Sequence, residues 1–193
     1  MDLLEAYRRS LTEFTDRVAQ VGSDQWTAPT PCPDWNVRAL VNHVVSEDRW
    51  TVPILAGATI AEVGNRFDRD LLGSSPATIT ADATAEAERA ASEPGALDRT
   101  VHLSAGDTPA SEYLRQLLAD HLVHGWDLAV AVGAEPRLDS EAVHECAIWF
   151  TQAERMYRDA GLIGPRFDVP GEASEQDRLL AAFGRDPAWH ASS

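Results

Sequence analysis

The stretch DHLVHGWDLA, residues 120–129, places an aspartate and two histidines within five residues, directly before a Trp-Asp pair. Leucine and alanine dominate its surroundings, and the helical spacing is regular. One face of the predicted helix is shared by Tyr113, Leu117, His121, Leu128 and Val132. Thr108-Pro109 predicts the start of this helix, and Gly133 follows its expected end near Val132. The stretch therefore raises both the question of the fold and the question of what these polar groups bind.

Further helices are predicted by the same combination of apolar spacing and end signals. The first spans about 4–21, and the second begins after the N-cap Asn36 and is kinked or ended by Pro53. Ser75-Pro76 combines an N-cap residue with a proline at the first helical position, and it predicts the start of a third helix. Another helix begins after Asp139 or Ser140 and ends at Asp159, and a short helix lies within 174–186. Residues 57–74 are predicted to form a loop with at most one helical turn, and residues 99–106 a short extended piece. Four long amphipathic helices without a clear strand pattern predict an all-α bundle, whose interior can hold metal ligands on facing helices.

Charge and composition exclude several classes of function. The 193 residues, compatible with a single domain over 1–193, carry 16 Lys+Arg against 31 Asp+Glu, a formal net charge of −15. This balance disfavours nucleic acid and anionic membranes as partners. The amino terminus lacks a signal peptide or a spanning segment, so a cytoplasmic location is expected. Cys32 and Cys146 are far apart and predict neither a disulfide framework nor a cysteine zinc site.

Asp120 and His124 lie four residues apart and therefore on one edge of their helix. A carboxylate and an imidazole at this spacing can reach a common cation, but a further ligand must come from another segment. His43, in LVNHVV, is the candidate because it lies at the margin of an apolar helical stripe. Such a set suits zinc, with nickel, iron or manganese as alternatives, and leaves positions for water or substrate. His121 is an equally available ligand by periodicity alone.

Each of these residues also has a simpler interpretation. A histidine on an apolar helix face is more often a hydrogen-bonded core residue than a ligand. Asp127 either orients an imidazole from outside the ligand set or faces water, and Glu47 is either an outer base or, more commonly for such a residue, a solvated charge. Surface positions are expected for His102, His144 and His190. Phosphate-binding glycine loops and a Gly-x-Ser-x-Gly elbow are absent from the sequence, so nucleotide and serine-hydrolase functions are not expected.

Three segments together resemble a known family: PTPCPDWNVRALVNHVV (29–45), HGWDLAVAVG (124–133) and DRLLAAFGRDPAW (177–189). They resemble the actinobacterial branch of the DinB-like superfamily, the metal-binding bundles related to the N-terminal domain of mycothiol-dependent maleylpyruvate isomerase. The resemblance implies a DinB-like four-helix bundle with extra short helices and a C-terminal tail. It also implies the ligand set His43, Asp120 and His124, which ranks His124 above His121. The isomerase relatives carry glutamate at the position of Asp120.

The resemblance further implies a chemistry. Several superfamily members use a divalent metal, commonly zinc, to activate a thiol such as mycothiol against an electrophilic small molecule. A metal-dependent transferase or isomerase with a small-molecule substrate is therefore expected, with its catalytic residues unassigned. The alternative is a noncatalytic, metal-containing binding or stress-related module. A homodimer is compatible with a small bundle, although no residue indicates one.

Overall fold

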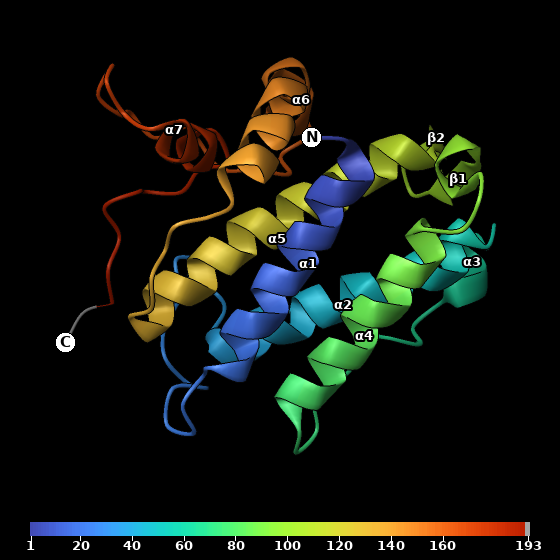
Figure 1. The fold of residues 1–193 in the computed structure, drawn as a ribbon, viewed down its shortest axis with the longest axis horizontal. Coiled ribbons are helices and arrows are strands. Elements are labelled where there is room, and N and C mark those ends of the chain that lie inside the picture. Colours follow the sequence, from blue (N-terminus) through green and yellow to red (C-terminus); the bar gives the residue numbers. More distant parts are fainter. Residues whose placement is uncertain (192–193) are drawn as a thin grey trace.

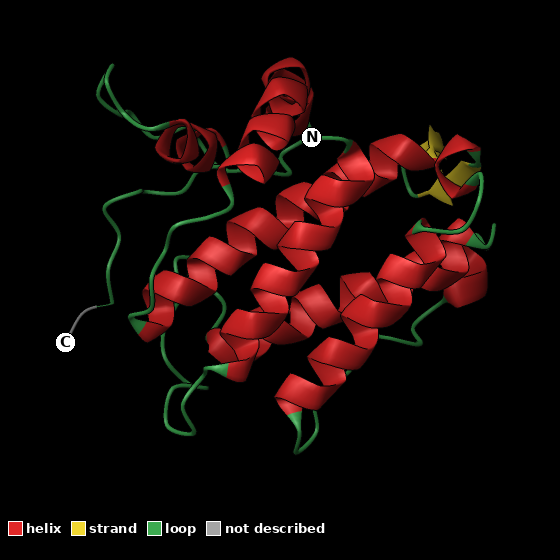
Figure 2. Ribbon diagram, viewed as in Figure 1, coloured by secondary structure: helices red, strands yellow, loops and turns green. Residues whose placement is uncertain are grey.

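A computed structural model describes residues 1–191 and confirms the all-α architecture (Figure 1). The elements are α1 (Leu3–Ala19), α2 (Val37–Leu55), α3 (Ile60–Val63), α4 (Pro76–Ala91), the 3₁₀ turn η1 (Ala96–Asp98), β1 (Thr100–Leu103), β2 (Gly106–Pro109), α5 (Ala110–Val132), α6 (Ser140–Asp159) and α7 (Glu175–Ala182). Helix α5 packs against α1, α2 and α6, while α4 covers α1 and α2. The short hairpin β1–β2 lies at one end of the bundle (Figure 2).

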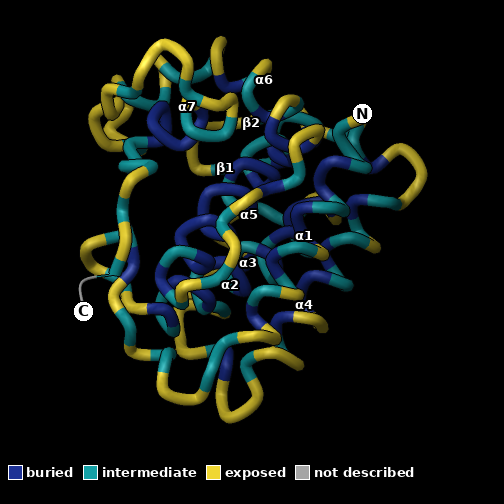
Figure 3. Tube along the Cα trace, turned by 60° about the vertical axis from the view of Figure 1, so that its left-hand side comes forward, coloured by how far each residue is buried: buried dark blue, intermediate teal, exposed yellow. Residues whose placement is uncertain are grey.

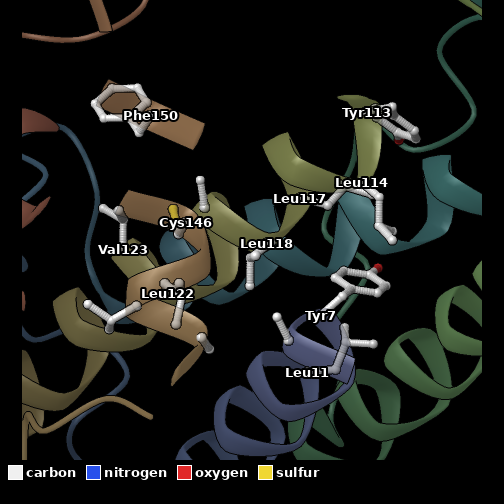
Figure 4. Close-up of a cluster of buried hydrophobic side chains, with 14 of the residues drawn as sticks. Tyr7, Leu11, Tyr113, Leu114, Leu117, Leu118, Leu122, Val123, Cys146 and Phe150 are labelled. Atoms are coloured by element: carbon white, nitrogen blue, oxygen red, sulfur yellow. The ribbon is translucent and has the colours of Figure 1, made fainter. Parts of the chain in front are cut away.

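The core explains why the long helices pack in this way. Buried segments run through the middle of the bundle, and the loops at its ends are exposed (Figure 3). Figure 4 shows part of the core, where α1, α5 and α6 contribute Tyr7, Leu11, Leu118, Leu122, Val123, Cys146 and Phe150. Nearly every residue from 117 to 131 of α5 is buried, so this helix is covered around most of its circumference. The polar groups of α5 are therefore placed inside the protein, where they need partners.

Predicted helix ends are confirmed where a side chain caps the backbone. Asn36 accepts a hydrogen bond from the N–H of Ala39, and Ser174 accepts one from Asp177. Gly133, with φ of +69°, adopts the left-handed conformation that ends α5. Ser75 is the N-cap residue of α4, but its side chain makes no capping hydrogen bond.

Two predicted boundaries are wrong. Helix α2, predicted to be kinked or ended by Pro53, does not end there but continues to Leu55. Pro53 removes one backbone hydrogen bond and crowds the preceding turn, but the buried Ile54 and Leu55 hold the last turn in the core. Thr108-Pro109 does not cap a helix. Thr108 pairs with Val101 in a β-hairpin, whose turn contains Gly106 at φ of +113°, and α5 begins only at Ala110.

Asp139 is the residue that starts α6, and replacing it by alanine is expected to lower the free energy of unfolding by about 1 kcal/mol. Its Oδ1 accepts hydrogen bonds from the N–H groups of Glu141 and Ala142, and Arg9 lies 3.3 Å from Oδ2. Burial opposes the charge of Asp139, but these donors outweigh it and lower its pKa. A lowered folded-state pKa stabilises the protein above the unfolded value, about 3.9, and this stabilisation is lost as pH falls through the folded value.

Urea denaturation of wild type and Asp139→Ala at pH 7 and in acid checks this prediction. The difference between the two proteins is expected to shrink below about pH 4. Asp139→Asn retains a capping oxygen and serves as the control with the smaller loss. An undiminished difference in acid would show that the carboxylate charge has no part in it.

Candidate metal centre

The three residues of the predicted ligand set lie together between two facing helices. Helix α2 provides His43, and α5 provides Asp120 and His124 one turn apart. One ligand atom from each residue lies within 4.8 Å of the other two. This juxtaposition joins residues 77 positions apart in the chain.

Asp120 lies between the two imidazoles. Its Oδ2 is 3.4 Å from Nε2 of His43, and its Oδ1 is 3.3 Å from Nε2 of His124. Oδ2 is buried but makes no hydrogen bond within the described structure. Burial opposes both charges, yet the imidazoles hold the pKa of Asp120 well below its usual range, and Asp120 with Asp127 holds the pKa of His124 well above its own. The geometry thus favours positive charge, from protons or a metal ion, beside this carboxylate.

The side of His124 away from Asp120 is fixed by a fully buried carboxylate. Nδ1 of His124 lies 2.9 Å from Oδ2 of Asp127. Such a partner sets the orientation of the ring and leaves Nε2 directed at Asp120, where a ligand atom is needed. Asp127 therefore occupies the place expected of a residue that orients an imidazole rather than one that faces water.

Arg185 completes this arrangement from the C-terminal segment. Its Nε donates to Oδ1 of Asp127 at 2.9 Å, and its Nη2 donates to Oδ2 at 2.9 Å. Gly184 makes the preceding turn with φ of +78°, and a Cβ at that position would lie 3.2 Å from the carbonyl oxygen of Pro165. Sequence reasoning missed Arg185 because it contacts Asp127 across 58 residues without any local spacing signal.

Cys32 is a second residue that sequence reasoning missed. The half-buried Sγ lies 3.4 Å from Oδ2 of Asp127 and accepts a hydrogen bond from Nη2 of Arg185 at 3.1 Å. Cys32, His124 and Asp127 also bring ligand atoms within 4.8 Å of one another. The thiol of Cys32 thus contacts the residues that orient His124. The proline-rich loop that carries it gave no spacing signal to α5.

Trp35, from the same loop, contacts two of the predicted ligands. Its ring centroid lies 4.7 Å from that of His43 and 5.5 Å from that of His124. The indole therefore limits the orientations of both imidazoles and covers one side of the cluster. Sequence spacing did not indicate this contact between the loop and the candidate site.

His121 lies elsewhere, on the core side of α5. Its Nε2 is 3.2 Å from Oδ1 of Asp48, and both side chains are fully buried. Two of the histidines expected at the surface have acidic neighbours that the sequence spacing did not indicate: His102 pairs with Asp107 at 2.7 Å and His144 with Glu175 at 2.9 Å.

Glu47 is not a solvated charge. It lines a pocket of about 350 Å³ that also reaches Asp120 and His124. Burial, reinforced by the negative charge of Asp120, raises the pKa of Glu47 to about 7. A carboxyl group in such an environment changes its protonation near neutral pH, so Glu47 can hold or release a proton beside the cluster.

Fold and cluster together define a helical-bundle protein with a candidate site of two imidazoles and a carboxylate beside a pocket. The family model described as the mycothiol maleylpyruvate isomerase N-terminal domain matches residues 7–129, and the chain belongs to this family. The match confirms the resemblance inferred from the sequence.

Relatives and one solved structure extend the comparison. Uncharacterized proteins from two strains of Mycobacterium tuberculosis are each 31% identical over 200 residues, covering 96% of this chain and 98% of the relative. The crystal structure of the mycothiol-dependent maleylpyruvate isomerase superposes with a TM-score of 0.58 at 15% identity, covering 79% of this chain and 73% of that one. At this identity the likeness shows the fold. Across residues 1–191, no helix combines the length and apolar character needed to cross a bilayer.

Proposed function

We propose that His43, Asp120 and His124 hold a divalent metal ion, and that the protein is a transferase or isomerase that activates a small thiol such as mycothiol. The observation that carries this proposal is the convergence of the three ligand atoms within 4.8 Å beside a pocket. The buried Oδ2 of Asp120 makes no hydrogen bond, and this supports a metal, because an ion would supply a close partner. Two imidazoles and a carboxylate suit zinc first, with nickel, iron or manganese as alternatives.

Three ligands beside a pocket favour a catalytic site over a structural one, which normally has four protein ligands. A bound divalent ion lowers the pKa of a coordinated thiol, so that the thiol is present at neutral pH as the nucleophilic thiolate. Glu47 is placed on the pocket wall to accept the proton that the thiol releases. Asp127 keeps His124 oriented, and the pocket gives the electrophilic small molecule a place beside the sulfur. The family name, which contains both mycothiol and an isomerase, supports the thiol and the reaction class.

Thiol binding is tested most clearly with protein loaded with cobalt(II), which reports thiolate coordination by a charge-transfer absorption band. Adding mycothiol is expected to produce this band, whereas S-methylated mycothiol, which has no ionisable thiol, is not. Mycothiol that leaves the spectrum of the bound cobalt unchanged would exclude thiol activation and support a noncatalytic metal module.

A further inference from the structure

The pocket beside the candidate ligands has an aromatic wall. Asp120 and His124 of α5 form one part of its lining, and another part comes from α6 and the C-terminal segment, which lie together beside α5 in Figure 1. Trp149, Tyr157 and Phe183 belong to this second part. Planar apolar groups are the natural contacts for such a surface.

The aromatic wall is held in place by contacts within the protein. The indole Nε1 of Trp149 donates to both carboxylate oxygens of Glu112, at 2.9 and 3.1 Å. Tyr157 meets Trp149 edge to face with ring centroids 5.8 Å apart, and Phe183 stacks on Phe150 at 3.7 Å. A preformed wall costs little ordering on binding, so it favours ligands with a rigid planar part.

The charges of the pocket disfavour an anionic ligand. Of the described residues that line it, only Arg185 carries a permanent positive charge, and its guanidinium already binds the buried carboxylate of Asp127 through two nitrogens. Glu47 and Asp120 bring two carboxyl groups to the same pocket, and the imidazole of His124 already lies 3.3 Å from Asp120 and 2.9 Å from Asp127. A carboxylate on the ligand would therefore meet only basic groups that already have a carboxylate partner.

We propose that the electrophilic substrate of this site is an uncharged molecule with a planar aromatic or conjugated part, not a dicarboxylate. The inference rests on the proposed function, because it concerns the co-substrate of the same site. Neutral polar groups, the amide of Gln116 and the hydroxyl of Tyr157, line the pocket and can bind the carbonyl oxygen of such a molecule. Maleylpyruvate, named in the related isomerase, is a diacid and lies outside this class.

A matched pair of ligands tests the charge preference. Benzylideneacetone and cinnamate share a conjugated phenyl skeleton and differ in a methyl ketone against a carboxylate. Their affinities are measured by ligand-observed NMR on zinc-loaded protein and on protein stripped of metal with a chelator. In the stripped protein the ketone is expected to bind at least about tenfold more tightly than cinnamate, a difference of about 1.4 kcal/mol. Equal or tighter binding of cinnamate in the stripped protein, or no binding of the ketone, would overturn the proposal.

Two glycines provide a matched test of the location. A Cβ added at Gly164, on the pocket wall, or at Gly171, which is exposed and outside the pocket, meets nothing within 4 Å. The carbonyl of each accepts a hydrogen bond from an arginine side chain. Gly164→Leu is expected to weaken ketone binding at least about tenfold and Gly171→Leu to leave it unchanged. Equal effects of the two variants would place the ligand elsewhere. Both binding tests use protein stripped of metal, so their outcomes do not depend on metal binding. A wild-type protein that binds no metal would refute the proposed function and leave these binding results interpretable.

Discussion

Replacing His121 by leucine is expected to lower the free energy of unfolding by about 3–5 kcal/mol, the usual cost of leaving one partner of a buried ion pair alone. Nε2 of His121 lies 3.2 Å from Asp48, and its Nδ1 lies 2.8 Å from the carbonyl oxygen of Leu117. Burial raises the pKa of Asp48, and the nearby His121 limits that rise by favouring the charged carboxylate. Without His121, Asp48 must be buried as an unpaired charge or take up a proton.

Urea denaturation of His121→Leu and of the double variant Asp48→Leu/His121→Leu measures this cost. The double variant is expected to recover much of the loss, because it removes the unpaired charge along with its partner. A single variant as stable as wild type would contradict the account. Metal affinity of the folded single variant is expected to equal that of wild type, since His121 lies outside the candidate ligand set.

Arg185→Met is expected to weaken metal binding about 10–100-fold, the range found when a residue that orients a ligand from outside the coordination sphere is lost. Arg185 fixes the carboxylate of Asp127, which lies 2.9 Å from Nδ1 of His124. Without the guanidinium, Asp127 is free to rotate or protonate, and His124 loses its fixed orientation. The substitution lies outside residues 7–129, so its effect would show that the C-terminal segment belongs to the site.

Competition with a chromophoric zinc chelator measures the affinity of wild type, Arg185→Met and Arg185→Lys. Lysine keeps the charge but cannot form the two-nitrogen contact, so an intermediate affinity is expected. Thermal unfolding of each variant shows whether it remains folded under the assay conditions. If folded Arg185→Met binds zinc as tightly as wild type, Arg185 has no positioning role.

The fold was largely predictable because its signals are local. Apolar spacing and capping residues such as Asn36, Asp139 and Ser174 act within a few positions, and the structure confirms the helices that they begin. The short extended piece predicted over 99–106 contains β1, but its pairing with β2 was missed because the hairpin joins two four-residue segments around Gly106, each too short to show a clear alternation.

The candidate site was predictable only in part, because some of its contacts join residues that are far apart in the sequence. The four-residue spacing of Asp120 and His124 is visible in the sequence, whereas spacing alone could not choose between His124 and His121. The family resemblance made that choice, and in the structure His124 contacts Asp120 while His121 contacts Asp48. Cys32 and Arg185 reach Asp127 across 95 and 58 residues, distances over which periodicity carries no information.

The most direct test of the account is the metal content of untagged wild type, His43→Ala and His124→Ala, measured by mass spectrometry. A tag-free protein is needed because a polyhistidine tag binds metal itself. Near-stoichiometric metal in wild type and its loss in both variants is the predicted result. A wild-type protein that is empty and takes up no zinc, nickel, iron or manganese on addition would contradict the account, and the His43, Asp120 and His124 cluster would then be a polar contact within a helical core.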